Sequence, residues 1–199
     1  MDVVEYLTLS IVFYMRFNVV FVGSVGGGKT SIIKKYMGNT SEHVSTIAVD
    51  FVSISLDDID VSVWDTCGQE RFMSITSSYF MRGHVFVLVH DVSDSTVTND
   101  LEKWYKEIIK NRPPRHVPVV IVATNKVDLS PFCTSEVSEW VSGYMFDHVY
   151  TSATTGEGID GLFNRIRDAI IVHQTDWLAP SLPVLPAMTE AAASPGCVC

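Results

Sequence analysis

A short glycine-rich segment constrains the fold of this chain more than any other part of the sequence. Residues 23–30 read Gly-Ser-Val-Gly-Gly-Gly-Lys-Thr and follow the apolar run Val19–Val22. A strand followed by G-x-x-x-x-G-K-[ST] is typical of a phosphate-binding loop, in which curled backbone N–H groups face the β-phosphate. In such a loop Lys29 reaches the β- and γ-phosphates, and the Thr30 hydroxyl binds Mg²⁺. The segment therefore predicts a nucleoside triphosphate site where a strand passes into a helix.

The length and composition fit one globular domain. The chain has 199 residues, of which 47% are hydrophobic and 19% are charged, as in folded proteins. Its formal charge of -9 argues against a general nucleic-acid binder, which clusters Lys and Arg. The four cysteines are too few and too scattered for a disulfide scaffold, so a reducing compartment is favoured.

Strand-like apolar runs alternate with segments of helical spacing. The runs occupy residues 19–22, 47–56, 61–64, 85–89, 117–122 and 148–150. This alternation predicts an α/β fold, a P-loop domain with a mainly parallel six-stranded sheet and helices on both faces. The polar residues 57–60 predict an antiparallel hairpin. Apolar stripes within 101–109 and 159–170 are expected to be the core faces of two helices.

The two ends of the chain differ from its middle. Residues 1–14 are expected to be an N-terminal extension, on one hypothesis a misassigned start, because their apolar stretch lacks the basic flank of a signal peptide. The nucleotide-binding domain is expected to span residues 15–173, with its first strand starting at Met15. Residues 174–199, in which Ala, Pro and Ser dominate from Ala179 onward, predict a flexible tail that ends in Cys-Val-Cys.

A second motif, Trp64–Glu70, follows the third apolar run. Asp65 would stand at the carboxyl end of the strand, beside the bound metal. Gly68 has the backbone freedom to bring its N–H to a γ-phosphate, and Gln69 is long enough to orient an attacking water. The motif predicts a metal ligand and the residues that act on the terminal phosphate.

A third motif points to the base. Residues 125–128 read Asn-Lys-Val-Asp and follow the apolar run 118–122. The Asp128 carboxylate can accept hydrogen bonds from N1–H and the exocyclic amine of guanine, whereas adenine offers no such donor pair. Ser152 or Ala153 can present a backbone N–H to the guanine oxygen. The sequence therefore favours GTP over ATP.

Together these motifs resemble the Rab family of small GTPases, within the Ras superfamily, over about residues 16–173. Segments 45–51, 64–72 and 75–79 look like its two switch regions. The resemblance implies a guanine-nucleotide switch that hydrolyses GTP to GDP and phosphate in vesicle trafficking, with switch segments that order around GTP. It makes Lys29 and Gln69 catalytic. It adds Thr46 to Thr30 and Asp65 as a ligand of Mg²⁺.

The resemblance also implies the full site and the partners. The residues assigned to GTP or GDP are Ser24, Val25, Gly26, Gly27, Gly28, Lys29, Thr30, Ser31, Thr46, Gly68, Asn125, Lys126, Asp128, Ser152 and Ala153. The implied protein partners are effectors, an exchange factor, a GTPase-activating protein, a GDP-dissociation inhibitor, and geranylgeranyltransferase with its escort protein. Phe51, Trp64 and Tyr79 match the aromatic surface that meets effectors, although ordinary sheet packing explains Phe51 and Trp64 equally well.

The last three residues, Cys197-Val198-Cys199, resemble the terminus that Rab proteins have geranylgeranylated on both thiols. A tail without basic residues needs two lipids, because one chain alone binds a bilayer only marginally. Lipidation at Cys197 and Cys199 would place the protein on the cytoplasmic face of intracellular membranes, with a cytosolic pool.

Several positions depart from the Rab pattern. Val25 stands where Rab proteins often have serine, and its branched side chain near the γ-phosphate predicts slow hydrolysis. Residues 37–44 contain no Phe, Tyr or Trp for the guanine, although His43 could take part of that role, and Thr154 replaces a usual lysine. One alternative is therefore a GTP-locked membrane recruiting module with little hydrolysis. Another is a P-loop ATPase, which Asp128→Ala would distinguish.

Overall fold

The computed structural model describes residues 16–38, 49–68, 78–94, 97–112, 117–130 and 135–178. The expectations for residues 1–15, for Thr46, for Gln69, and for the tail with Cys197 and Cys199 lie outside the described residues.

Six strands form one sheet. They are β1 (Phe17–Val22), β2 (Val49–Leu56), β3 (Ile59–Thr66), β4 (Val85–Asp91), β5 (Val119–Asn125) and β6 (Asp147–Tyr150), in the order β2-β3-β1-β4-β5-β6. β2 pairs antiparallel with β3, and the other pairings are parallel. The predicted six-stranded, mainly parallel sheet and its hairpin are confirmed.

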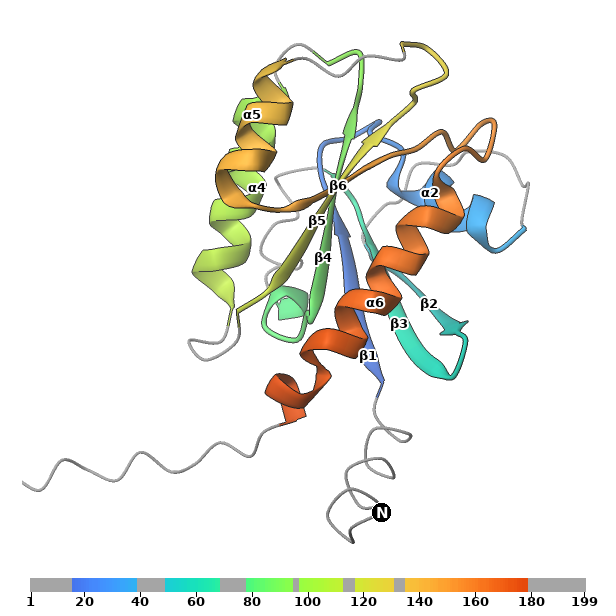
Figure 1. Ribbon diagram of the computed structural model, residues 1–199, viewed down its shortest axis with the longest axis vertical. Coiled ribbons are helices and arrows are strands. Elements are labelled where there is room, and N and C mark those ends of the chain that lie inside the picture. The colour runs from blue at the N-terminus through green and yellow to red at the C-terminus, as the bar shows by residue number, and fades with distance from the viewer. Residues whose placement is uncertain are drawn as a thin grey trace, which may run out of the picture.

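Four labelled helices cover the two faces of the sheet. They are α2 (Lys29–Tyr36), α4 (Val97–Asn111), α5 (Ser135–Tyr144) and α6 (Ile159–Leu178). Figure 1 shows α4 and α5 on one side of the sheet and α2 and α6 on the other. Along β1, Val19 and Phe21 pack with α2 and α6, whereas Val20 and Val22 pack with α4 and α5. Burial on both faces explains why the central strands are continuous apolar runs.

The apolar stripes predicted for two helices are core faces. On α4, Leu101, Trp104 and Ile108 are buried. On α6, the buried residues are Ile159, Leu162, Phe163, Ile166 and Ile170. Each stripe follows the helical period, so each helix turns one apolar side to the sheet.

The predicted end of the domain at His173 is wrong, because α6 continues to Leu178. The ring of Trp177 lies 5.9 Å from Phe17 and 5.0 Å from His84, so the last turns pack against the beginnings of β1 and β4. The change in composition after His173 pointed to a tail, but the aromatic contacts of Trp177 keep the chain helical. At the other end, β1 begins at Phe17.

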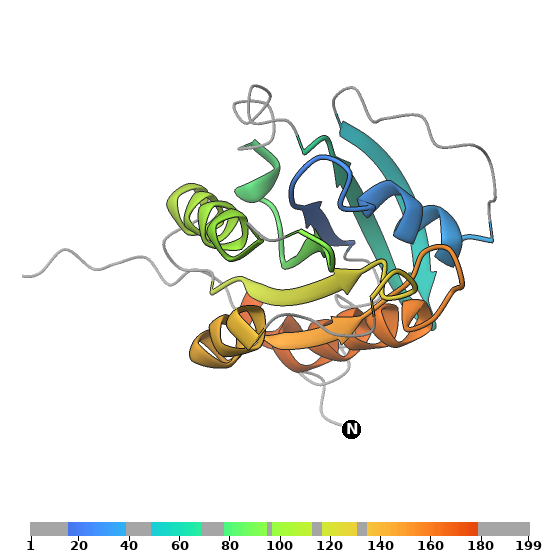
Figure 2. The same cartoon turned by 90° about the horizontal axis from the view of Figure 1, so that it is seen from above.

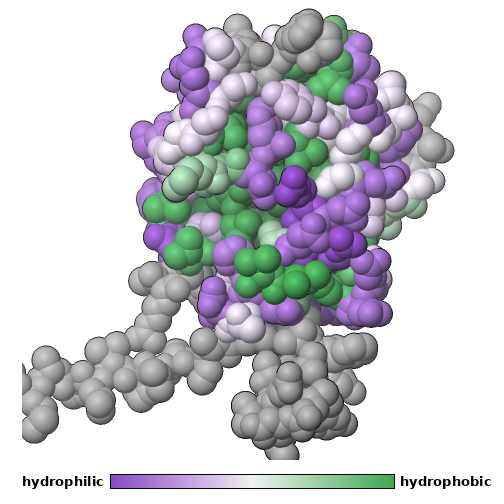
Figure 3. Space-filling view, viewed as in Figure 1, coloured by the Kyte–Doolittle hydropathy of each residue, from purple (hydrophilic) through white to green (hydrophobic). Residues whose placement is uncertain are grey.

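The outward surface of α6 is mixed. Figure 3 shows hydrophobic patches beside hydrophilic side chains on the face viewed in Figure 1. Ile171 and Val172 are 49% and 68% exposed, so neither belongs to the core stripe. Among the described residues, no helix has the length and apolar character to cross a membrane.

The parallel strands end together at one edge, and the loops that follow them carry the predicted motifs. In Figure 2, which looks from above, the segment joining β1 to α2 arches over this end of the sheet. Ligands of such sheets bind at the carboxyl ends of the strands, so the fold brings the three motifs to one place.

Candidate nucleotide-binding site

The phosphate loop ends where α2 begins. Gly28 is the residue before the helix, with a φ of 98° in the left-handed region and no side-chain cap on the first turn. A Cβ at this position would lie 2.1 Å from Asn125 Nδ2, so only glycine fits. The first N–H groups of α2 therefore face the loop without a side-chain cap, which favours an anion at this point.

Lys29 lies beneath the loop, and its side chain is buried. Its Nζ donates to the carbonyl oxygens of Gly23 and Ser24, at 2.8 and 3.0 Å. Burial lowers the pKa of Lys29 from 10.5 to about 8, while the nearby Asp65 and Cys67 act in the opposite direction. The ammonium group therefore keeps its charge at neutral pH and holds it next to the loop.

Two hard oxygen ligands meet beside Lys29. The Thr30 hydroxyl donates to Asp65 Oδ2 at 2.5 Å, and Asp65 is buried at the end of β3. Hydroxyl and carboxylate oxygens are the ligands that Mg²⁺ accepts in proteins. The two predicted ligands thus fit a magnesium ion, while Thr46 lies outside the described residues.

The second motif touches the phosphate loop at Gly68. A Cβ on Gly68 would lie 2.5 Å from Val25 N, so the close approach requires glycine. Val25 itself is 59% exposed. The structure therefore places Gly68 against the phosphate loop, while its contact with a γ-phosphate stays a prediction and Gln69 lies outside the described residues.

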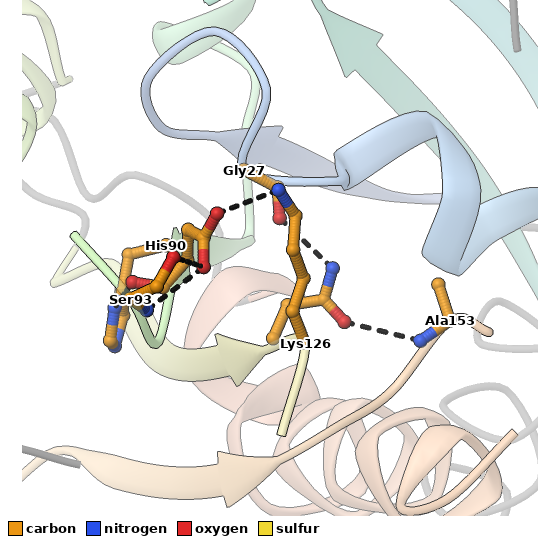
Figure 4. Close-up of polar contacts among 7 residues, drawn as sticks. Gly27, His90, Ser93, Lys126 and Ala153 are labelled. Atoms are coloured by element: carbon orange, nitrogen blue, oxygen red, sulfur yellow. Dashed lines mark hydrogen bonds and ion pairs between the residues drawn. The ribbon is translucent and has the colours of Figure 1, made fainter. Parts of the chain in front are cut away.

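Asn125 ties the phosphate loop to the loop after β6. Its side chain is buried, and its Nδ2 donates to Gly27 O at 2.9 Å. Its Oδ1 accepts hydrogen bonds from Thr151 Oγ1 and Ala153 N, both at 3.2 Å. The dashed lines at Gly27 and Ala153 in Figure 4 mark two of these hydrogen bonds. The sequence placed Asn125 at the nucleotide, and the structure adds this bracing role.

The base-binding residues assigned from the sequence also lie together. Ser152 Oγ donates to Asp128 Oδ1 at 2.5 Å, and Asp128 is exposed at the surface of the site. The backbone N–H of Ser152 donates to Glu157 O at 2.9 Å. Since Ala153 N already contacts Asn125, an N–H directed at guanine stays a prediction.

Lys126 is held by an acidic residue that the sequence analysis did not assign. Its Nζ lies 2.6 Å from Asp91 Oδ2, and Asp91 Oδ1 accepts hydrogen bonds from the backbone and hydroxyl of Ser93 (Figure 4). Burial raises the pKa of Asp91, but the hydrogen bonds from Lys126 and Ser93 outweigh it and leave the pKa below its usual value. Asp91 is therefore charged at neutral pH and positions Lys126.

The loop in which Thr154 replaces the usual lysine is contacted by α2. Lys35 Nζ donates to the carbonyl oxygen of Thr154 at 3.0 Å. The residue type at position 154 matters little for this contact, because its backbone is the acceptor. A lysine from another element thus contacts the loop in which the usual lysine is absent.

The buried side chains of Thr124 and His90 and the half-buried side chain of His148 form a row of polar groups across neighbouring strands. Thr124 Oγ1 lies 2.7 Å from both His90 Nε2 and His148 Nε2, and His90 Nδ1 lies 3.2 Å from Asp91 O. A carbonyl only accepts, so His90 donates from Nδ1 and accepts from the Thr124 hydroxyl at Nε2. His148 then donates to the same hydroxyl oxygen. Burial lowers the pKa of His90 to about 4 and also lowers the pKa of His148.

The buried histidine predicts acid sensitivity. In the unfolded chain His90 has its ordinary pKa of about 6.5, whereas in the folded protein its pKa is about 4. Between these two pKa values the unfolded chain binds a proton at His90 and the folded protein does not, so stability falls as pH falls from about 7 toward about 4. The free energy of unfolding should drop by about 2 kcal/mol between pH 7.5 and 5 through His90 alone. The free energy of unfolding, measured with urea at pH 7.5 and pH 5, should fall less in His90→Phe than in the control variant His173→Phe. Equal drops in the two variants would contradict the assignment.

The sequence comparisons agree with this geometry. The profile of the Ras family matches residues 18–172. The chain is 31% identical to the Ras-related protein Rab7 of Glycine max and 30% identical to that of Vigna aconitifolia, in each case over 92% of this chain and 96% of the relative. It is 30% identical to the GTP-binding protein YPT1 of Saccharomyces cerevisiae, over 74% of this chain and 75% of the relative. With the phosphate loop, the oxygen pair and the base motif at one end of a Ras-type sheet, the chain belongs to the Rab family of small GTPases, which bind GTP or GDP with Mg²⁺ and hydrolyse GTP.

Proposed function

We propose that this GTPase recruits effectors to intracellular membranes when GTP is bound and releases them after hydrolysis. The observation that carries the proposal is the link made by Asn125. One side chain joins the phosphate loop at Gly27 to the base-side loop at Ala153. Occupation of the base site and the position of the phosphate loop are therefore coupled.

The hydrolysis site is proposed from the same geometry. The charged Lys29 and the N–H groups at the start of α2 stabilise the negative charge that develops on the γ-phosphate oxygens and the β–γ bridging oxygen. Gln69 is proposed to orient the attacking water. Mg²⁺, when bound, supplies a positive charge to the phosphates. Thr30 and Asp65 would hold that ion, together with Thr46.

The alternative is a GTP-locked recruiting module, and Val25 is the residue that favours it. Its side chain is 59% exposed at the loop, and its backbone nitrogen lies close to Gly68 of the second motif. A branched side chain there would exclude an arginine finger, a group worth about 10³- to 10⁵-fold in rate.

Val25→Ser should therefore raise GTP turnover, because the smaller side chain leaves room at the γ-phosphate. We expect at least about a tenfold increase in the presence of a GTPase-activating protein, measured as phosphate released in a single turnover. Val25→Ile keeps the branched bulk and should stay slow.

A slow but measurable wild-type rate supports the cycling switch. A wild-type protein that releases no phosphate, with or without the activating protein, supports the locked module. Equal rates for Val25→Ser and Val25→Ile would refute the steric explanation.

Effectors are proposed to bind the aromatic cluster of Phe51, Trp64 and Tyr79. The ring of Trp64 lies 4.8 Å from Phe51 and 4.6 Å from Tyr79, and Phe51 is 49% exposed. Trp64 and Tyr79 are half-buried, so they hold the exposed Phe51 ring in place and the three rings together offer a rigid apolar surface to a partner. The test is whether a partner selective for the GTP form loses binding to Phe51→Ala.

Membrane attachment is proposed through lipids on Cys197 and Cys199, added by geranylgeranyltransferase with its escort protein. A GDP-dissociation inhibitor would then maintain the cytosolic pool, and an exchange factor would load GTP at the cytoplasmic face of the membrane. Mass spectrometry of the C-terminal peptide from the source cell tests the lipids directly. Unmodified thiols would remove this part of the proposal.

A further inference from the structure

Ser24 joins the phosphate loop to helix α4. Its hydroxyl donates to a carboxylate oxygen of Asp100, which lies in the first turn of α4. Its carbonyl oxygen accepts a hydrogen bond from Lys29 Nζ at 3.0 Å and one from Gly27 N at 3.3 Å. A single residue thus connects α4, the loop backbone and the buried ammonium group.

The loop has a hollow on the side that faces α4. This hollow has a volume of about 240 Å³ and is lined by residues 23–27 of the loop, the end of β4, Asp94, Lys126, and Asp100, Leu101 and Trp104 of α4. Side chains do not fill the space between the loop and the helix, so packing alone does not fix the loop there. The contact from Ser24 to Asp100 spans the two walls of the hollow.

We infer that Asp100 is a positioning residue for the phosphate loop, acting through Ser24. The Asp100 carboxylate holds the Ser24 hydroxyl, and the Ser24 backbone in turn holds Lys29 and the curl at Gly27. The inference rests on the proposed role of this loop in binding the nucleotide phosphates. Without the carboxylate, the loop is free to move into the hollow, and bound nucleotide is released faster.

A purely structural role for Asp100 makes a different prediction. An acidic residue in the first turn of a helix stabilises that helix through the positive end of its dipole. In that case Asp100→Ala destabilises α4, but Ser24→Ala leaves nucleotide release unchanged. Removal of the Ser24 hydroxyl therefore separates the two roles.

The experiment measures release of fluorescently labelled GDP from the full-length protein with Mg²⁺, after an excess of unlabelled GDP is added. The variants are Ser24→Ala, Asp100→Ala, the double variant and Asp100→Asn. Each single alanine variant should release GDP about tenfold faster, as expected for loss of a hydrogen bond to a charged group. The double variant should be no faster than either single variant, because one contact is lost in all three. Asp100→Asn keeps an acceptor oxygen and should restore most of the slow release.

Asn99→Ala is the matched control, because Asn99 is exposed in the same turn of α4. Its release rate should equal that of the wild type. The inference is overturned if Ser24→Ala releases GDP at the wild-type rate, or if the effects of the two single variants multiply in the double variant. A wild-type protein that binds no guanine nucleotide would instead contradict the proposed function, so the two failures are distinguishable.

Discussion

Asp128→Ala should remove the preference of this protein for guanine over adenine nucleotides. The carboxylate is exposed in the site, and Ser152 Oγ holds its Oδ1 at 2.5 Å. Guanine presents two donors to such a carboxylate, and each hydrogen bond to a charged acceptor contributes about 1.5–3 kcal/mol. GDP affinity should fall by at least about 100-fold while ADP affinity stays unchanged. Equilibrium titration of both nucleotides with the wild type and the variant measures the two affinities.

Asp128→Asn sharpens this test, because the asparagine amide has one acceptor and one donor group. The variant should lose affinity for GDP and gain affinity for xanthosine diphosphate. The base of xanthosine carries a carbonyl in place of the exocyclic amine, and this carbonyl can accept a hydrogen bond from the asparagine amide. Ser152→Ala removes the hydroxyl that holds the carboxylate, so it should weaken GDP binding less than Asp128→Ala does. If Asp128→Ala kept its preference for GDP over ADP, another residue would have to read the base.

Asn125→Ala should have the second large effect, on both nucleotide binding and stability. The side chain is 1% exposed and makes hydrogen bonds to Gly27, Thr151 and Ala153. Its removal breaks the link between the phosphate loop and the base-side loop and leaves buried polar groups without partners. Each such group lowers the free energy of unfolding by about 1–3 kcal/mol. GDP affinity should fall by at least about 100-fold. Titration calorimetry measures the affinity, and thermal unfolding measures the stability.

Thr151→Val is the matched control for Asn125→Ala. It removes one of the three hydrogen bonds while the contacts of Asn125 with Gly27 and Ala153 persist. Its loss of GDP affinity should be less than about tenfold. An Asn125→Ala protein with wild-type affinity would mean that the two loops bind their parts of the nucleotide independently.

The main features of the fold and the three motifs were predictable because their signals are local. Strands β1, β4 and β5 are continuous apolar runs, so burial on both faces follows from the sequence itself. The phosphate loop needs glycine at defined positions, and Gly28 shows why, since any side chain there would collide with Asn125. The chemistry of each motif lies within a few consecutive residues.

The contacts that hold the motifs together were not predictable from one sequence. Ser24 and Asp100 are 76 positions apart, and Lys35 and Thr154 are 119 apart. Strand order and register bring such residues together, and hydrophobic periodicity determines neither. The same is true of Thr124 and its two histidines, which come from β4 and β6 on either side of β5. The end of α6 was missed because aromatic contacts from Trp177 to β1 and β4 outweigh the local composition.

The most direct test of the central claim is to purify the protein, denature it and identify the released nucleotide by chromatography. A guanine-nucleotide switch with this site retains its ligand, so guanine nucleotide should be released in near-stoichiometric amount and adenine nucleotide should be absent. Mostly GDP would show that the protein hydrolyses GTP despite Val25, and mostly GTP would favour the locked recruiting module. Release of adenine nucleotide, or a folded protein that carries no nucleotide and takes up no added GDP, would contradict the account.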